Sequence, residues 1–331
     1  MRLEAFTEAK THGAPDTNED SFLLLPGRAY AVVDGVTDRV GTRYGGMLSG
    51  RYASRLIVET LETLLVPAGA PLDQPWLAVE AATGALRGAY DAHGVTEAVR
   101  EDWNRQMAAT LALVTLTDEH AHVLLLGDSG VRLNGETVWQ EGKDIDTVTA
   151  TLRAVAWAAV ACRTDDPAAR ERVSRAVCWG GVAHAAPSAA PFLNEADLRA
   201  VADCTVARCR TALPHLPGDA IAAVVEGGIV HAQGGHQNNP ASPFGYPSLN
   251  GFPVPRTMVR TERVPRTRLQ TLELFTDGYF APGRTFGVES WEQRFREVEG
   301  EDPHKVGPFA STKGTTATQW ADDRTYLGVA F

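Results

Sequence analysis

The fold is decided by the stretch Arg28-Ala-Tyr-Ala-Val-Val-Asp-Gly-Val-Thr-Asp38. Residues Ala29 to Val33 form a short apolar run, which is typical of a buried strand. The run ends at Asp34-Gly35, so one carboxylate stands at a strand end. The glycine that follows it has a backbone able to turn sharply and to approach a ligand. The stretch therefore predicts a strand that presents Asp34 to a binding site.

Four further acidic motifs lie at predicted strand ends far away in the chain. They are Asn18-Glu19-Asp20, Gly127-Asp128-Ser129, Thr276-Asp277-Gly278 and Asp322-Asp323. For any single Asp-Gly pair a simple turn is the commoner explanation. Carboxylates are, however, the hard oxygen ligands that Mg²⁺ and Mn²⁺ prefer. Taken as a set, the motifs favour a two-metal phosphatase centre with Asp34 at its middle.

Composition narrows the class of protein. The chain has 331 residues, of which 44% are hydrophobic and 22% charged, as in a globular protein with a sizeable core. A net charge of −10 disfavours nucleic acid and anionic membrane surfaces as partners. The longest apolar run, Ala154 to Cys162, is too short to cross a bilayer. The first residues lack a secretory signal, so we expect a cytoplasmic protein.

The order of the predicted elements indicates how they pack. Strands come first, two helices follow, and a hairpin comes next, which favours antiparallel sheets covered by helices over a doubly wound parallel sheet. The predicted strands cover residues 2–10, 18–25, 29–33, 109–116, 122–126, 256–263, 269–276 and 325–331. The predicted helices cover residues 42–65, 76–93, 144–162, 167–178, 194–213 and 289–298.

One long stretch, His231 to Pro255, is rich in Gly, Asn and Pro. A segment of this length without regular structure is often a lid or a binding loop. Its histidines, its Asn238-Asn239 pair and the aromatics Phe244 and Tyr246 are candidates for substrate contacts. A hydrogen-bonded surface loop is the alternative.

In their order and approximate spacing, the acidic motifs resemble those of the metal-dependent protein phosphatases of type 2C (the PPM family). The resemblance covers residues 1–140 and 256–331 and leaves out most of 141–255. It implies an α/β (α+β) fold, a four-layer α-β-β-α sandwich with two antiparallel sheets. It also implies a single domain over residues 1–331, with 141–255 as an elaborated helical and flap-like insertion.

The resemblance assigns a role to each carboxylate. Asp34 would bridge two Mn²⁺ or Mg²⁺ ions, and the Gly35 carbonyl would contact one of them. Asp277 and Asp322 would hold the other ion, while Asp128 would support a weaker third site. Glu19 and Asp20 would act mainly through metal-bound waters.

The activity implied is hydrolysis of phosphoserine or phosphothreonine in a protein. The nucleophile would be a metal-activated bridging water, so Asp34 and Asp277 are the candidate catalytic residues. Two alternatives stay open. One is a catalytically weak, phosphatase-like binding or regulatory module, and the other is a phosphatase of small phosphorylated metabolites.

Several positions depart from the family pattern. The family usually places a phosphate-binding Arg five residues before the Asp of its first motif, where this chain has Pro15. Thr37-Asp38 replace the glycines that normally follow Asp-Gly, and Gly130 replaces the usual Arg after Gly-Asp-Ser. A guanidinium from elsewhere can bind phosphate instead. The candidates are Arg39, Arg43 and Arg132, each with the alternative of a solvated surface charge.

Overall fold

The structure is a computed structural model that describes residues 1–37 and 39–331; Asp38 lies outside the described residues. The chain divides into two compact units. Unit 1 comprises residues 1–142, 246–297 and 322–331, and unit 2 comprises 143–245 and 298–321. Unit 2 thus contains most of the predicted insertion over 141–255, while residues 141–142 and 246–255 belong to unit 1. That the whole chain is one domain stays a prediction.

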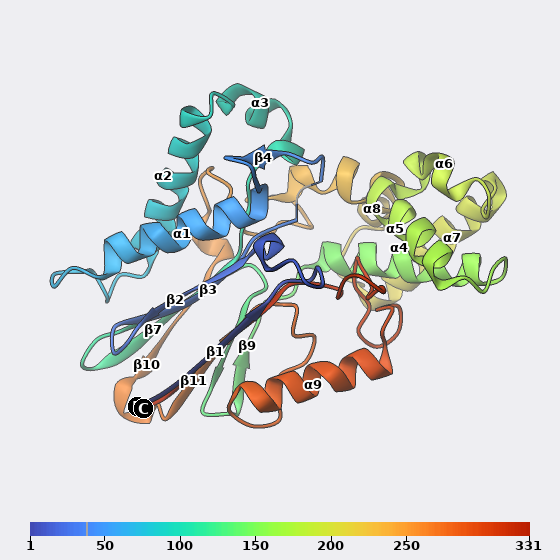
Figure 1. The fold of residues 1–331 in the computed structure, drawn as a ribbon. Helices are drawn as coiled ribbons and strands as arrows, with labels where there is room; N and C mark the ends of the chain where they lie inside the picture. Colours follow the sequence, from blue (N-terminus) through green and yellow to red (C-terminus); the bar gives the residue numbers. More distant parts are fainter. Residues whose placement is uncertain (38) are drawn as a thin grey trace. The chain divides into compact units, whose positions relative to one another are not determined.

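Two five-stranded antiparallel sheets make up the centre of unit 1 (Figure 1). The first sheet has the order β1-β12-β11-β8-β9 and the second β10-β7-β6-β3-β2. The strands of the first sheet are β1 (Arg2–Glu8), β12 (Arg324–Ala330), β11 (Thr271–Phe275), β8 (Gly130–Leu133) and β9 (Thr137–Trp139). Those of the second are β10 (Arg260–Pro265), β7 (His120–Leu126), β6 (Leu111–Leu116), β3 (Ala29–Asp34) and β2 (Asp20–Leu25).

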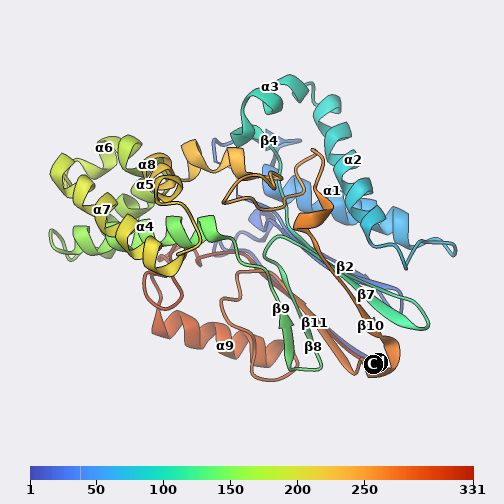
Figure 2. The same cartoon turned by 180° about the vertical axis from the view of Figure 1, so that it is seen from behind.

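Helices cover the outer faces of both sheets. Helices α1 (Ser49–Leu65) and α2 (Trp76–Ala92) lie along the second sheet, and α9 (Val288–Glu301), of which unit 1 contains residues 288–297, lies along the first (Figures 1 and 2). The short α3 (Thr96–Glu101) follows α2. Trp291 of α9 packs its ring 4.7 Å from that of Phe275 and 5.1 Å from that of Tyr326. The predicted α-β-β-α sandwich of two antiparallel sheets is confirmed.

Strand β3 lies between two hydrophobic cores, one on each face of its sheet. Its residues point alternately to the two faces of the sheet, as in any strand. Ala29, Ala31 and Val33 belong to the core shared with α1 and α2. Tyr30 and Val32 belong to the core between the two sheets. The run is apolar throughout because both of its faces are buried.

The sequence prediction was wrong about the start of α1. Instead of a helix from residue 42, the chain forms a small hairpin of β4 (Arg43–Tyr44) and β5 (Met47–Leu48). The turn between them uses Gly45 and Gly46, whose φ angles of 55° and 81° end any helix here. Strands β8 and β9 were not predicted, because they are only four and three residues long.

Unit 2 is helical: α4 (Asp144–Ala161), α5 (Pro167–His184), α6 (Ala186–Ala189), α7 (Glu195–Ala212) and α8 (Gly218–Ala232). The predicted cap of α7 is confirmed, since Asn194 and Asp197 form a reciprocal capping box. Helix α5 runs past its predicted end at Cys178, and α8 was not predicted. Both helices are kinked at glycines, Gly181 (φ 70°) and Gly228 (φ 58°). The two backbones touch there, since a Cβ on Gly228 would lie 2.3 Å from the nitrogen of Gly181.

No helix among the described residues is long and apolar enough to span a membrane.

Candidate metal centre

Three of the predicted ligands meet at one point. Asp34, Asp128 and Asp277 each offer a carboxylate oxygen, and the three oxygens lie within 4.8 Å of one another. They follow or end β3, β7 and β11, so both sheets contribute to the cluster. Burial raises the pKa of the Asp34 carboxyl well above its usual range, and the charges of Asp20 and Asp322 raise it further. Carboxylates crowded in this way fit a cation.

Asp20 stands beside Asp34, its partner across β2 and β3. Its Oδ2 accepts a hydrogen bond of 2.8 Å from the hydroxyl of Thr276. Its Oδ1 is buried and has no hydrogen-bond partner among the described residues. Burial raises the pKa of Asp20 well above its usual range, and the charge of Asp323 adds to that effect. A buried carboxylate oxygen without a donor is costly unless a cation satisfies it, so Asp20 also fits a metal ligand.

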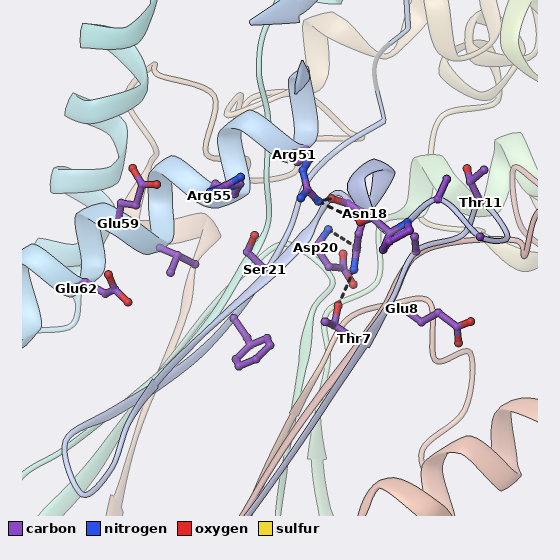
Figure 3. Close-up of a pocket in the computed structure, with 16 residues that line it drawn as sticks. Thr7, Glu8, Thr11, Asn18, Asp20, Ser21, Arg51, Arg55, Glu59 and Glu62 are labelled. Atoms are coloured by element: carbon purple, nitrogen blue, oxygen red, sulfur yellow. Dashed lines mark hydrogen bonds between the residues drawn. The ribbon is translucent and has the colours of Figure 1, made fainter. Parts of the chain in front are cut away.

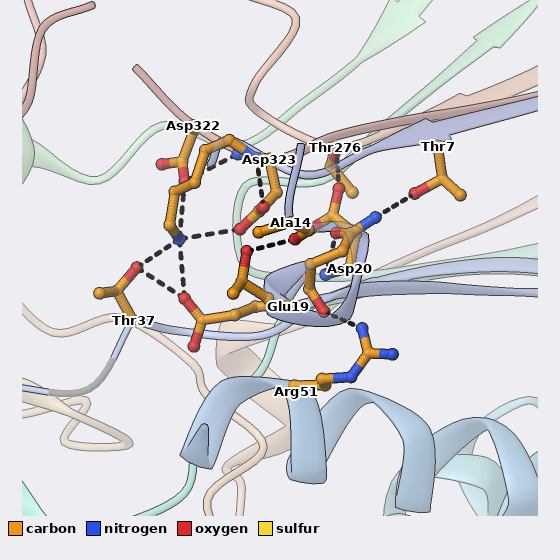
Figure 4. Close-up of polar contacts among 12 residues, drawn as sticks. Thr7, Ala14, Glu19, Asp20, Thr37, Arg51, Thr276, Asp322 and Asp323 are labelled. Atoms are coloured by element: carbon orange, nitrogen blue, oxygen red, sulfur yellow. Dashed lines mark hydrogen bonds and ion pairs between the residues drawn. The ribbon is translucent and has the colours of Figure 1, made fainter. Parts of the chain in front are cut away.

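The other predicted ligands, Glu19 and Asp322, which Figure 4 labels, both form ion pairs with Lys10. Lys10 Nζ lies 2.7 Å from Glu19 Oε2 and 3.5 Å from Asp322 Oδ1. It also lies 2.8 Å from Asp323 Oδ2 and 2.9 Å from the hydroxyl of Thr37. Burial by itself lowers the pKa of the Lys10 ammonium, but the surrounding carboxylates, Asp322 first, outweigh burial and hold that pKa well above its ordinary value.

The backbone around Gly35 is held tightly. Its N–H donates to the carbonyl of Glu19 at 3.2 Å, and Thr110 N–H donates to the carbonyl of Asp34 at 2.9 Å. A Cβ on Gly35 would lie 2.2 Å from the carbonyl oxygen of Gly50. Only glycine fits this close approach to the backbone of α1, a contact that the sequence did not predict. The proposed contact between the Gly35 carbonyl and an ion stays a prediction.

The three arginines proposed as phosphate ligands have different surroundings. Arg132 is buried and forms a bidentate ion pair with Glu273. Its Nε lies 2.6 Å from Glu273 Oε2 and its Nη2 lies 2.7 Å from Oε1. Its guanidinium also donates to the carbonyls of Gly283 and Thr285. Because these contacts occupy the guanidinium, we do not retain Arg132 as a phosphate ligand. Arg39 stacks on the ring of Trp103 at 4.6 Å, and the exposed Arg43 donates to the carbonyl of Gly46.

A pocket of about 650 Å³ opens beside Asp20 and Pro15 (Figure 3). Two arginines of α1, Arg51 and Arg55, line it. Arg51 Nη1 donates to the carbonyl of Asn18 at 2.6 Å, so its guanidinium lies close to the first acidic motif. Neither arginine was predicted as a site residue, because both lie within the helix predicted over residues 42–65, away from the acidic motifs.

The aromatics of the predicted binding loop are buried rather than displayed. Phe244 and Tyr246 are 3% and 7% exposed. His236, in the same stretch, shares a hydrogen bond of 2.6 Å with the hydroxyl of Ser242. His231 belongs to the last turn of α8. These contacts agree with the alternative of a hydrogen-bonded loop, and a role in substrate binding stays a prediction.

No family model and no curated protein sequence matches the chain. Among solved structures, it is similar to the serine/threonine phosphatase Stp1 from Staphylococcus aureus, with 13% identity over 100% of this chain and 96% of that one, at a TM-score of 0.46. It is also similar to the catalytic domain of the phosphatase PstP in complex with two manganese ions, with 17% identity over 99% and 96% of the chains, at a TM-score of 0.46. A bacterial serine phosphatase matches at 12% identity over 100% and 97%, with a TM-score of 0.46.

Two of these matches are described as serine/threonine phosphatases and one as a serine phosphatase. At identities of 12–17% and TM-scores of 0.46, the likeness by itself assigns no activity to the chain.

Proposed function

We propose that the chain is a metal-dependent phosphomonoester hydrolase that acts on phosphoserine or phosphothreonine in proteins. The observation that carries the proposal is the meeting of Asp34, Asp128 and Asp277 at the ends of three strands. The buried, donor-free oxygen of Asp20 beside them supports it. A bound Mn²⁺ or Mg²⁺ ion lowers the pKa of water and neutralises charge on a phosphoryl group.

The protein's own residues have distinct tasks in this proposal. Asp34, Asp128 and Asp277 hold the ion, and Thr276 fixes the Asp20 carboxylate through its hydrogen bond. Gly35 lets the strand end pack against α1. Arg51 and Arg55 replace the guanidinium missing at Pro15 and contact the substrate phosphate from the pocket. Arg39 and Arg43 remain further candidates for that contact.

The experiment is hydrolysis of para-nitrophenyl phosphate and of a phosphothreonine peptide with and without millimolar Mn²⁺. We expect metal-dependent turnover that falls by about 100-fold or more in Asp34→Asn and Asp277→Asn, because each variant removes a candidate ligand. Asp118→Asn, in the exposed turn between β6 and β7, is the matched control and should keep full activity. Wild-type protein that releases no phosphate from either substrate would refute the proposal.

A second candidate function is a phosphatase-like module that binds phosphorylated proteins without hydrolysing them. Two observations favour it: Pro15 offers no guanidinium, and Lys10 already neutralises part of the acidic cluster. Fluorescence anisotropy with a labelled phosphothreonine peptide separates the two functions. Tight binding with no phosphate release in Mn²⁺ supports the module, whereas turnover that is lost in Asp34→Asn excludes it.

A further inference from the structure

The ammonium of Lys10 is built into the acidic centre rather than lying on its surface. Lys10 is 9% exposed, and Glu19 is 1% exposed. An ammonium has three donors. Three acceptors, on Glu19, Thr37 and Asp323, lie within 2.9 Å of Nζ. All three hydrogens of the ammonium therefore have an acceptor, and Asp322 adds a fourth oxygen at 3.5 Å.

The main chain fixes Lys10 in this place. Strand β1 pairs with β12 along its length, with Glu8 opposite Arg324. Lys10 follows β1 and Asp323 precedes β12, and the backbone N–H of Lys10 donates to Asp323 Oδ1 at 2.7 Å. Asp323 thus binds both the backbone and the side chain of Lys10. Such a doubly held side chain is preorganised for this position.

The acidic residues consequently fall into two groups. Glu19, Asp322 and Asp323 surround the Lys10 ammonium. Asp34, Asp128 and Asp277 form the cluster that fits an ion, with Asp20 next to them. A divalent ion bound to the oxygens of the first group would have to displace the ammonium or lie in contact with it. Two cations in contact repel strongly in a buried site.

We propose that the ammonium of Lys10 stands in for one of the two divalent ions, so that the chain binds a single ion at Asp34, Asp128 and Asp277. This inference rests on the metal-dependent function proposed above. Lys10 is then a tethered cation that balances Glu19 and Asp322 and keeps them in place. The negative charge of the carboxylates is then balanced by one exchangeable metal ion and by the ammonium of Lys10, which is part of the chain.

The test counts bound Mn²⁺ by equilibrium dialysis and metal analysis, and records low-temperature electron paramagnetic resonance spectra. We expect one Mn²⁺ per wild-type chain, with the six-line spectrum of an isolated ion. Lys10→Gln should bind a second Mn²⁺ and show the splitting of a coupled pair. Lys10→Arg keeps the charge and should still bind one. Lys143→Gln, in unit 2, is the matched control and should behave as wild type.

The number of bound Mn²⁺ ions tests whether Lys10 takes the place of one metal ion. Two ions in the wild type overturn the role of Lys10 and leave the metal-dependent hydrolase intact. One ion in both the wild type and Lys10→Gln also overturns it. No bound ion in any variant overturns both the inference and the proposed function. If Lys10→Gln does not fold, the wild-type count and the Lys10→Arg spectrum still decide, since two ions or a coupled spectrum in either contradicts the proposal.

Discussion

Thr276 donates its hydroxyl to Oδ2 of Asp20 at 2.8 Å and thereby connects the two sheets of unit 1. Asp20 begins β2 of the second sheet, whereas Thr276 directly follows β11 of the first. The same hydroxyl oxygen accepts the backbone N–H of Thr325 at 2.8 Å. One small side chain therefore fixes a carboxylate of the candidate metal centre and the start of β12.

We expect Thr276→Val to lower the free energy of unfolding by about 1–3 kcal/mol, because it leaves a buried carboxylate and a buried N–H without their partner. Urea unfolding followed by fluorescence measures the change. Thr63→Val is the matched control. Its hydroxyl is exposed and bonds only to the Glu59 carbonyl of its own helix, so a change within about 0.5 kcal/mol is expected. Equal effects at both positions would show that the sheet-to-sheet bond contributes nothing.

The metal-free protein should become less stable as the pH rises above about 4, the ordinary pKa of an Asp in an unfolded chain. Burial raises the pKa of Asp34 and Asp20 in the folded protein, so the folded state binds more protons than the unfolded state. Their contribution is fully present below the unfolded pKa and is lost as the pH rises through the folded pKa. Thermal unfolding in EDTA from pH 4 to pH 8 checks this.

Asp34→Asn tests the same effect. Without metal at pH 7.5, we expect this variant to melt about 2 °C or more above wild type, the shift that roughly 1 kcal/mol produces in a domain of about 200 residues, the size of unit 1. With millimolar Mn²⁺ the order should reverse, because only the wild type gains stability from the ion. A metal-free midpoint below that of wild type would contradict the repulsion inferred at Asp34.

Arg51→Gln should raise the KM for a phosphorylated substrate. If Arg51 contacts the phosphate, the loss of one charge-assisted hydrogen bond lowers kcat/KM by about 10- to 100-fold, which corresponds to roughly 1.5–3 kcal/mol. Steady-state kinetics on a phosphothreonine peptide measure it. Arg100→Gln, an exposed change in α3, serves as the control. Unchanged kinetics in Arg51→Gln would rule out Arg51 as a phosphate contact and leave Arg55, Arg39 and Arg43 as the candidates.

Arg132→Met should damage folding rather than substrate binding. It leaves Glu273, which is fully buried, with its charge uncompensated, at a cost of about 3–5 kcal/mol. The double variant Arg132→Met/Glu273→Met should recover much of that loss, since both charges are then removed. Circular dichroism during urea unfolding gives the three free energies. A raised KM with unchanged stability would instead place Arg132 in the substrate site.

Three of the predicted carboxylates, Asp34, Asp128 and Asp277, meet in the structure, and each lies at or just after the end of a largely buried strand. Asp34 after Ala29–Val33 is the clearest case, and Asp128 and Asp277 follow the same logic. The order of the helices and strands then indicated antiparallel sheets. The end of α5 beyond Cys178 and the whole of α8 were not predicted. Both helices contain a glycine with positive φ, Gly181 and Gly228, and these two residues let the helix backbones touch.

Which side chains surround the site depends on how the strands pair. The spacing of residues along the sequence does not give this pairing. Arg132 was a candidate because it lies three residues after Ser129, yet β8 pairs it directly with Glu273 of β11. Lys10 was overlooked because Asp322 is 312 residues away. Only the pairing of β1 with β12 brings them together. Arg51 was not predicted because it lies within a helix, and its position beside Asn18 depends on how that helix packs against β2.

The pairing of β1 with β12 also sets when the centre can form. While the chain is being made, Lys10 and Glu19 leave the ribosome more than 300 residues before Asp322 and Asp323. Closing so long a loop has a high entropic cost, so we expect this pairing to form late in folding. A nascent or interrupted chain therefore has its tethered ammonium but not the two aspartates it balances. The acidic centre can therefore assemble only after Asp322 and Asp323 have been synthesised.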